Sequence, residues 1–191
     1  RWTPDTLRHI TNLPELPEEL DAGYAVLLDK DGLASNLRPS TLQGYIPKPP
    51  SESEYIEHIE NFLLDATYVA KFLYRGDRIA AHHILDEMMK QESLRPMLEW
   101  RMEIEHGWSL KPGPYMRRIQ TWLRPELMAA LENTYTGLDP AATWDALYNT
   151  IALMRTTARE VGNALGYEYP ARMEERILAH VRQVQELPPI G

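Results

Sequence analysis

Prolines divide this sequence into two unlike parts. Seven of its 15 prolines lie among the first 50 residues, and the last of them belong to the stretch Lys48-Pro49-Pro50-Ser51. Proline fixes φ, lacks a backbone N–H and pushes the preceding residue towards extended geometry. We therefore expect residues 1–50 to form short elements and turns, and the proline-rich stretch to be a stiff linker.

One strand is predicted in the first part. The run Tyr24-Ala25-Val26-Leu27-Leu28 is rich in strand-forming residues, and the turn residues Asp29-Lys30-Asp31-Gly32 follow it. Residues 1–50 are thus expected to be the tail end of a domain that contains a sheet. Because the chain begins with Arg1 and not with methionine, we also expect its natural N-terminus to lie further upstream.

After Pro50 the pattern becomes helical. Apolar residues recur at helical spacing from Tyr55 to Leu73, and Ser51 or Ser53 can cap this helix. Further helices are predicted from Asp77 onwards, over 96–107, near 115–123 and 125–134, from Asp139-Pro140 to Gly166, and over 171–187. The predicted fold class is mainly α. Residues 51–191 form a bundle of five to seven helices, preceded by a short α/β remnant.

The charge of the chain limits its partners. Twenty Lys and Arg against 28 Asp and Glu give a formal charge of −8. Nucleic acids and anionic membranes favour positively charged proteins, so we expect neither as the main partner. Residues 51–111 hold seven basic and twelve acidic residues, a pattern typical of a solvated helix face or of a cleft for a cationic ligand.

Other function classes are excluded by what the sequence lacks. Without cysteine there is no disulfide, zinc–thiolate site or thiol catalysis. No apolar run approaches the roughly 18 residues of a membrane span, and we expect no signal peptide. We therefore expect a cytoplasmic location.

Several short motifs occur in the order and at the spacing of one enzyme family. They are Tyr68-Val69-Ala70-Lys71-Phe72-Leu73-Tyr74-Arg75-Gly76-Asp77, then the stretches 94–100 and 104–108, then Trp144-Asp145-Ala146-Leu147, and finally the stretch 165–170. Over about residues 20–187 the chain resembles the C-terminal portion of the aminoglycoside 6-adenylyltransferases (streptomycin adenylyltransferases). The resemblance implies the end of a nucleotidyltransferase α/β domain over 1–50 and a helical substrate-binding domain over 51–191.

The resemblance also implies a reaction. Members of the family transfer AMP from ATP to a hydroxyl of a cationic aminoglycoside such as streptomycin, which confers antibiotic resistance. Paired aspartates after a Gly-Ser motif hold magnesium ions on ATP, and these stabilise the attacking and leaving oxygens. We expect the complete enzyme to use ATP and magnesium, and its upstream nucleotidyltransferase domain to be a partner of this chain.

The paired aspartates are not found in this chain. Asp29-Lys30-Asp31 has the right letters, but no Gly-Ser precedes it, and Asp5 follows Pro4 among polar residues. We therefore assign no catalytic residue and no metal ligand here, and we expect this chain alone to hold no cofactor and to transfer no AMP. The adjacent His82 and His83 do not share a metal, because neighbouring helical residues point about 100° apart.

Two groups of binding residues are predicted. By the resemblance, Lys71 approaches the nucleotide phosphates, and Arg75 lies on the same helix face four residues later. Either can instead be a long side chain that covers apolar surface at the bundle edge. The predicted substrate-binding residues are Trp100, Glu105, Trp144, Asp145 and Tyr148.

The substrate-binding set is chosen because carboxylates bind guanidinium groups through charge-assisted hydrogen bonds and aromatic rings stack on them. Each member also has a plain structural interpretation. Trp100 can be a core residue, Glu105 a surface acid, and Asp145 an acid that stabilises a helix N-terminus.

Two other functions remain open. The spacing Arg101 to His106 matches the Arg-x4-His pattern of HEPN-type ribonucleases, although the acids between them and the net charge oppose RNA binding. The chain can also be a non-catalytic helical interaction module. If the chain is part of an enzyme, we expect an acidic pocket. If it is a ribonuclease, we expect Arg101 and His106 to converge. If it is an inert module, we expect neither.

Overall fold

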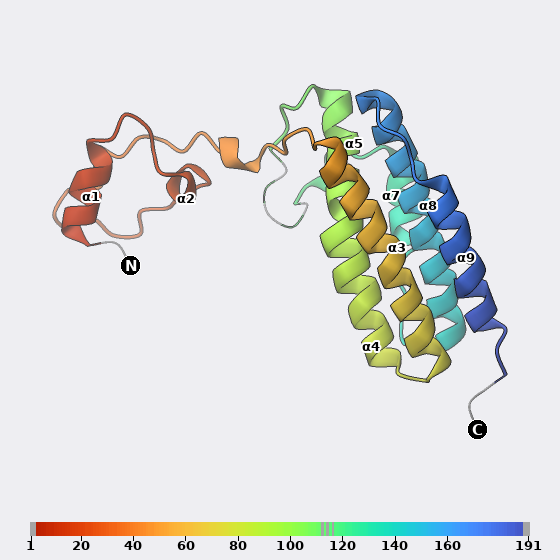
Figure 1. Cartoon of the computed structure of the whole chain (residues 1–191). Helices are drawn as coiled ribbons and strands as arrows, with labels where there is room; N and C mark the ends of the chain where they lie inside the picture. The colour runs from red at the N-terminus through yellow and green to blue at the C-terminus, as the bar shows by residue number, and fades with distance from the viewer. Residues whose placement is uncertain (1–2, 112, 114, 116, 189–191) are drawn as a thin grey trace.

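The computed structural model describes residues 3–111, 113, 115 and 117–188. Its helices follow one another along the chain, and Figure 1 shows the longest of them side by side in one bundle. Their bounds are α1 Pro4–Thr11, α2 Glu18–Asp21, η1 Gln43–Tyr45, α3 Glu52–Tyr74, α4 Arg78–His82, η2 His83–Leu94, α5 Arg95–His106, α6 Ile119–Trp122, α7 Pro125–Glu132, α8 Pro140–Leu165 and α9 Ala171–Gln185.

Helix α3 lies at the centre of the bundle. It packs against α4, η2, α8 and α9, while α5 packs against α8 (Figure 1). The apolar stripe predicted for α3 is buried, with Tyr55, Ile59 and Phe62 fully covered. The mainly α fold class is confirmed. Among the residues described, no helix is long and apolar enough to cross a membrane.

The predicted helix ends are largely confirmed because local capping chemistry sets them. Of the two candidate caps for α3, the structure uses Ser51, whose hydroxyl accepts the Glu54 N–H while the Glu54 carboxylate accepts the Ser51 N–H. Asp139 caps α8 by accepting the Ala142 N–H at 2.9 Å. Gly166 ends α8 with φ of +82°, a conformation that glycine adopts without a steric penalty.

The strand predicted over residues 24–28 is wrong. These residues form neither a helix nor a strand, and Val26, Leu27 and Leu28 are exposed, Leu27 to 95%. A strand needs a neighbour to pair with its backbone, and no strand is present in the ranges that the structure describes. The predicted α/β remnant therefore contains helices and loops here, without a sheet.

The helix predicted after Asp77 is present, but its hydrogen-bonding pattern changes along its length. A short α4 continues into the π-helix η2, in which the hydrogen bonds run from residue i to i+5. The pattern of apolar residues does not separate the two helix types, because both present a stripe of buried side chains. η2 also carries a buried lysine, Lys90, which is only 2% exposed.

Residues 3–48 lie beside one end of the bundle (Figure 1). They are held to it by few polar contacts. Lys111 Nζ, from the loop after α5, donates to the Thr41 carbonyl oxygen. The Tyr167 hydroxyl donates to the Pro50 carbonyl oxygen at 2.9 Å and so fixes the start of α3 against the loop after α8.

Candidate functional site

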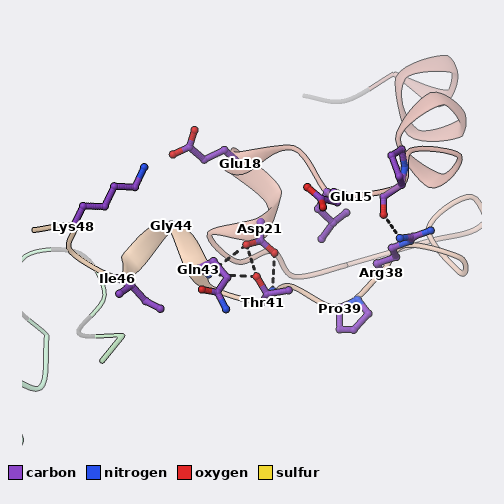
Figure 2. Close-up of a pocket in the computed structure, with 12 residues that line it drawn as sticks. Glu15, Glu18, Asp21, Arg38, Pro39, Thr41, Gln43, Gly44, Ile46 and Lys48 are labelled. Carbon is purple, nitrogen blue, oxygen red and sulfur yellow. Dashed lines mark hydrogen bonds between the residues drawn. The ribbon is translucent and has the colours of Figure 1, made fainter. Parts of the chain in front are cut away.

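An open cavity of about 600 Å³ lies within residues 14–48. This volume is within the range of ordinary ligand pockets, about 300–1,000 Å³. Figure 2 shows its acidic residues Glu15, Glu18 and Asp21 and its basic residues Arg38 and Lys48 around one hollow. The remaining lining residues are Pro14, Leu16, Pro39, Thr41, Gln43, Gly44 and Ile46.

Asp21 organises one wall of this cavity. Its carboxylate accepts the Thr41 N–H at 2.7 Å, the Thr41 hydroxyl at 2.6 Å and the Gln43 N–H at 3.3 Å (Figure 2). The Thr41 hydroxyl, followed by these backbone N–H groups, holds the pKa of Asp21 below its ordinary value. Asp21 is therefore an anion at neutral pH and ties α2 to the loop before η1.

The other charges of the cavity are open to a ligand. Glu15 and Glu18 are exposed, and neither forms an ion pair with any residue that the structure describes. Of the basic residues, Arg38 is partly engaged, because its Nη1 donates to the Pro14 carbonyl oxygen. The cavity thus offers unpaired carboxylates to a cationic group, which bind it by charge-assisted hydrogen bonds.

Glu105, one of the predicted substrate-binding residues, is already paired within the protein. Its Oε1 accepts from Arg101 Nη2 at 2.7 Å and lies 3.7 Å from Arg124 Nε. Glu160 in α8 accepts from Arg101 as well, and from Arg124 Nη2 at 2.5 Å. Partial burial raises the pKa of Glu160, but the hydrogen bonds from the two arginines outweigh burial, and the pKa lies below its ordinary value. This cluster joins α5, α7 and α8.

Trp100 has no free face for stacking on a ligand. Its side chain is 8% exposed and lies in the core, where the His58 ring meets it edge to face with 5.0 Å between ring centroids. The structural interpretation of Trp100 as a core residue therefore holds in this structure.

Trp144, Asp145 and Tyr148 lie far from Glu105. The rings of Trp144 and Tyr148 stack at 6.3 Å, the Tyr148 hydroxyl donates to Gln185 Oε1 at 2.7 Å, and Asp145 is exposed. Trp144 precedes Glu160 by 16 positions in α8, which is about 24 Å along the axis. The structure therefore does not bring the predicted substrate-binding residues together in one site.

Lys71 and Arg75 lie at the end of α3 that points away from residues 3–48 (Figure 1). Lys71 Nζ sits 4.3 Å from the centroid of the Tyr68 ring and 4.8 Å from that of Phe72, and Arg75 is exposed at the C-cap. Twenty residues of helix, about 30 Å, separate Lys71 from Ser51. A ligand in the cavity of residues 14–48 does not extend to them, and a nucleotide contact by either stays a prediction.

The ribonuclease pattern is not assembled. Arg101 bonds to two carboxylates, and His106 Nδ1 lies 2.9 Å from the Met102 carbonyl oxygen of its own helix. The two side chains therefore do not converge on a common groove, and the HEPN-type interpretation is wrong for this structure.

The Asp29 carboxylate is already hydrogen-bonded within its own loop. Its carboxylate oxygens accept the N–H groups of Leu33 and Ala34, both at 2.9 Å, and so close the loop that follows. No three carboxylate or histidine side chains gather closely enough to hold a metal ion within the described part of the chain.

The acidic cavity residues were missed in the sequence. The run Glu15 to Asp21 holds four acids in seven residues, but it lies between prolines in a segment without helical periodicity. The signal that points to them is the density of acids in this short run.

Comparisons with known proteins agree on one family. The family model for streptomycin adenylyltransferase matches residues 5–184. An aminoglycoside 6-adenylyltransferase of Bacillus subtilis is 30% identical over 151 residues, which are 78% of this chain and 52% of that protein. One of Campylobacter jejuni is 28% identical over 185 residues, which are 94% of this chain and 63% of that protein.

A solved structure is similar in fold as well. The crystal structure of an aminoglycoside 6-adenyltransferase from Bacillus subtilis matches with a TM-score of 0.67 and 25% identity, over 73% of this chain and 52% of that one. The chain therefore spans about half to two thirds of the length of the relatives it matches.

Proposed function

Because the chain belongs to the streptomycin adenylyltransferase family, we propose that the complete protein transfers AMP from ATP to a hydroxyl of a cationic aminoglycoside such as streptomycin. In this reaction the hydroxyl oxygen forms a bond to the α-phosphorus, the bond from that phosphorus to the bridging oxygen breaks, and pyrophosphate leaves. The hydroxyl proton passes to a base that we do not assign. The chain's main part in this proposal is to bind the sugar.

The observation that carries the proposal is the cavity with unpaired carboxylates. Glu15 and Glu18 lack ion-pair partners among the described residues, and Asp21 is held as an anion beside them. Guanidinium and ammonium groups of an aminoglycoside are the complementary chemistry. Glu105 fits this role less well, since Arg101 already occupies its carboxylate.

We further propose that residues 1–50 are the end of the nucleotidyltransferase domain and that residues 51–191 are the helical domain. The exposed apolar side chains of Val26, Leu27 and Leu28 support this division, because apolar residues left in water here are those that the rest of such a domain would cover. ATP and magnesium belong to the proposed reaction. We assign no magnesium ligand to the described residues, because Asp29 is bonded to its own loop and no metal cluster is formed there.

Titration calorimetry of this chain tests the proposal. We expect streptomycin to bind, and to bind more weakly at high salt because exposed charges are screened. A neutral disaccharide and an uncharged analogue of similar size should not bind. The double variant Glu15→Gln/Glu18→Gln should weaken streptomycin binding by about tenfold or more, through loss of two charge-assisted contacts.

The matched control is Glu87→Gln together with Glu132→Gln, two acids outside the cavity that give the same change in net charge. This control should bind streptomycin as the parent chain does. If streptomycin fails to bind, or if both double variants bind equally well, the assignment of the sugar site to this cavity is wrong.

A further inference from the structure

A second cavity, of about 230 Å³, is lined by residues of the loop after α5 and by Ala22, Leu42 and Tyr45. Its lining contains three cations, Lys111, Arg117 and Arg118, and no carboxylate. The other lining residues are Ala22, Leu42, Tyr45 and Gly113. In a chain of net charge −8, a cavity lined by basic residues without acids is a marked local reversal of charge. Such a cavity attracts anions.

Lys111 is held in place from both sides of the cavity. Lys111 Nζ donates to the Thr41 carbonyl oxygen, and the preceding residue, Leu110, donates its N–H to Glu103 Oε2 at 3.2 Å. Glu103 is fully buried in α5, so the base of the loop is fixed to the bundle. The Lys111 side chain thus reaches from the bundle to the segment that forms the other wall.

Arg117 and Arg118 line the same cavity, and the loop that carries them has an unusual backbone. Gly113, Tyr115 and Arg118 all have positive φ, of +77°, +57° and +68°. Left-handed conformations at residues other than glycine are unfavourable, and they concentrate at ligand-binding sites where the neighbouring structure enforces them. Neither arginine forms an ion pair with a described residue, in contrast to Arg101 and Arg124 in the bundle.

The basic cavity adjoins the acidic one. Asp21 and Thr41 line the acidic cavity, and the next residues, Ala22 and Leu42, line the basic cavity. The charge of Lys111 contributes to the low pKa of Asp21. A polycation and a polyanion can therefore be held next to each other, in cavities lined by neighbouring residues.

We propose that Lys111, Arg117 and Arg118 bind the polyphosphate chain of the nucleotide. This inference rests on the proposed function, because it takes ATP as the source of the polyphosphate. The chemistry itself is general: several cations converge on one small cavity, and guanidinium groups bind phosphate oxygens in pairs. Inorganic pyrophosphate carries the same recognition chemistry and is the simplest probe.

The test is a set of titrations of this chain with pyrophosphate, ATP and adenosine. Pyrophosphate and ATP should bind with marked salt dependence, and adenosine should not bind, because the site recognises phosphates. The variant Arg117→Ser/Arg118→Ser should weaken pyrophosphate binding by about tenfold or more. The control Arg172→Ser/Arg176→Ser changes two exposed arginines of α9 by the same charge and should bind pyrophosphate as the parent does.

The outcomes separate this inference from the proposed function. If streptomycin binds the chain but pyrophosphate does not, or if both arginine double variants lose pyrophosphate binding equally, the phosphate site is wrong while the sugar site stands. If ATP binds only as tightly as adenosine, recognition is through the base and the inference is likewise overturned. Circular dichroism of each variant confirms that the helices are retained.

Discussion

Gly162 occupies a position in α8 where no larger side chain fits. A Cβ added there would lie 2.7 Å from the Tyr55 hydroxyl oxygen and 2.8 Å from the Tyr167 carbonyl oxygen. Tyr55 is fully buried, and its hydroxyl donates to the Ala158 carbonyl oxygen at 2.9 Å, so it has little room to move. We expect Gly162→Ala to lower the free energy of unfolding by about 1–3 kcal/mol, despite the higher helix propensity of alanine.

Urea unfolding measures this effect. Gly137→Ala is the control, because nothing lies within 4 Å of a Cβ at that position and its φ is not positive. Equal stability of the two variants would show that α3 and α8 do not approach each other as closely as described.

Lys90 is buried, and its side-chain nitrogen contacts three other residues. Its Nζ donates to Asp86 Oδ1 at 2.7 Å and to the Thr134 carbonyl oxygen at 2.6 Å, and it lies 4.0 Å from the centroid of the Tyr135 ring. Asp86→Asn leaves the buried ammonium without its carboxylate, whereas Lys90→Met removes the buried charge itself. We expect Asp86→Asn to cost about 1–3 kcal/mol, a range reduced because Asp86 is partly exposed, and Lys90→Met to cost less.

The pH dependence of unfolding tests the same pair. Partial burial raises the pKa of Asp86, but the hydrogen bonds from Lys90 and His82 outweigh it, and the pKa lies below its ordinary value of 3.8. Asp86 therefore stabilises the fold above that pH, and its contribution is lost as the pH falls through the lower, folded-state pKa. The difference between the parent and Asp86→Asn should shrink in acid. A difference that grows in acid would contradict the assignment.

Single site residues were the hardest features to predict. Glu105 was chosen for its residue type and its family-like surroundings, but its role depends on Arg101, four residues earlier, and on Arg124, which directly precedes α7. The second carboxylate of that cluster, Glu160, lies 59 positions from Arg101. Pairing over such separations is decided by packing, which no local pattern contains.

At the level of the helices, two serines near the N-terminus of α3 can be compared directly. Ser51 takes part in the capping box with Glu54, whereas Ser53 is exposed in the first turn. Ser51→Ala should lower the free energy of unfolding by about 1 kcal/mol, since it removes a cap from the central helix. This corresponds to a fall in melting temperature of about 2–4 °C. Ser53→Ala should change the free energy of unfolding by less than half of that amount.

Differential scanning calorimetry of the two serine variants distinguishes them. A larger loss of stability for Ser53→Ala than for Ser51→Ala would mean that α3 begins later in the chain. It would contradict the assignment of Ser51 as the cap.

Helices were predictable as elements because their determinants are local. The apolar spacing of α3, the Asp139-Pro140 start of α8 and the Gly166 end of α8 all act within a few residues. The run over residues 24–28 failed for the opposite reason. Strand propensity is local, but the pairing that makes a strand is not, and no partner strand lies in the described part of the chain.

At the scale of the whole molecule, charge is sorted by position. The excess of acids in residues 51–111 is typical of a solvated helix face or of a cleft for a cation, and in the structure Glu105 and Glu160 are paired with Arg101 and Arg124. Two cavities that involve residues 14–48 also hold unpaired charges: Glu15, Glu18 and Lys48 line one of them, and Lys111, Arg117 and Arg118 line the other. This arrangement is the basis of the proposed sugar and phosphate sites.

The position of the sugar site is the central claim, and nuclear magnetic resonance of the ¹⁵N-labelled chain measures it directly. On addition of streptomycin, we predict shifts in the amide signals of Glu15, Glu18, Asp21 and Gln43 around the cavity. The amides near Trp144 and Tyr148 should not move. Shifts confined to the first turns of α8, or no shifts at saturating streptomycin, would contradict the account.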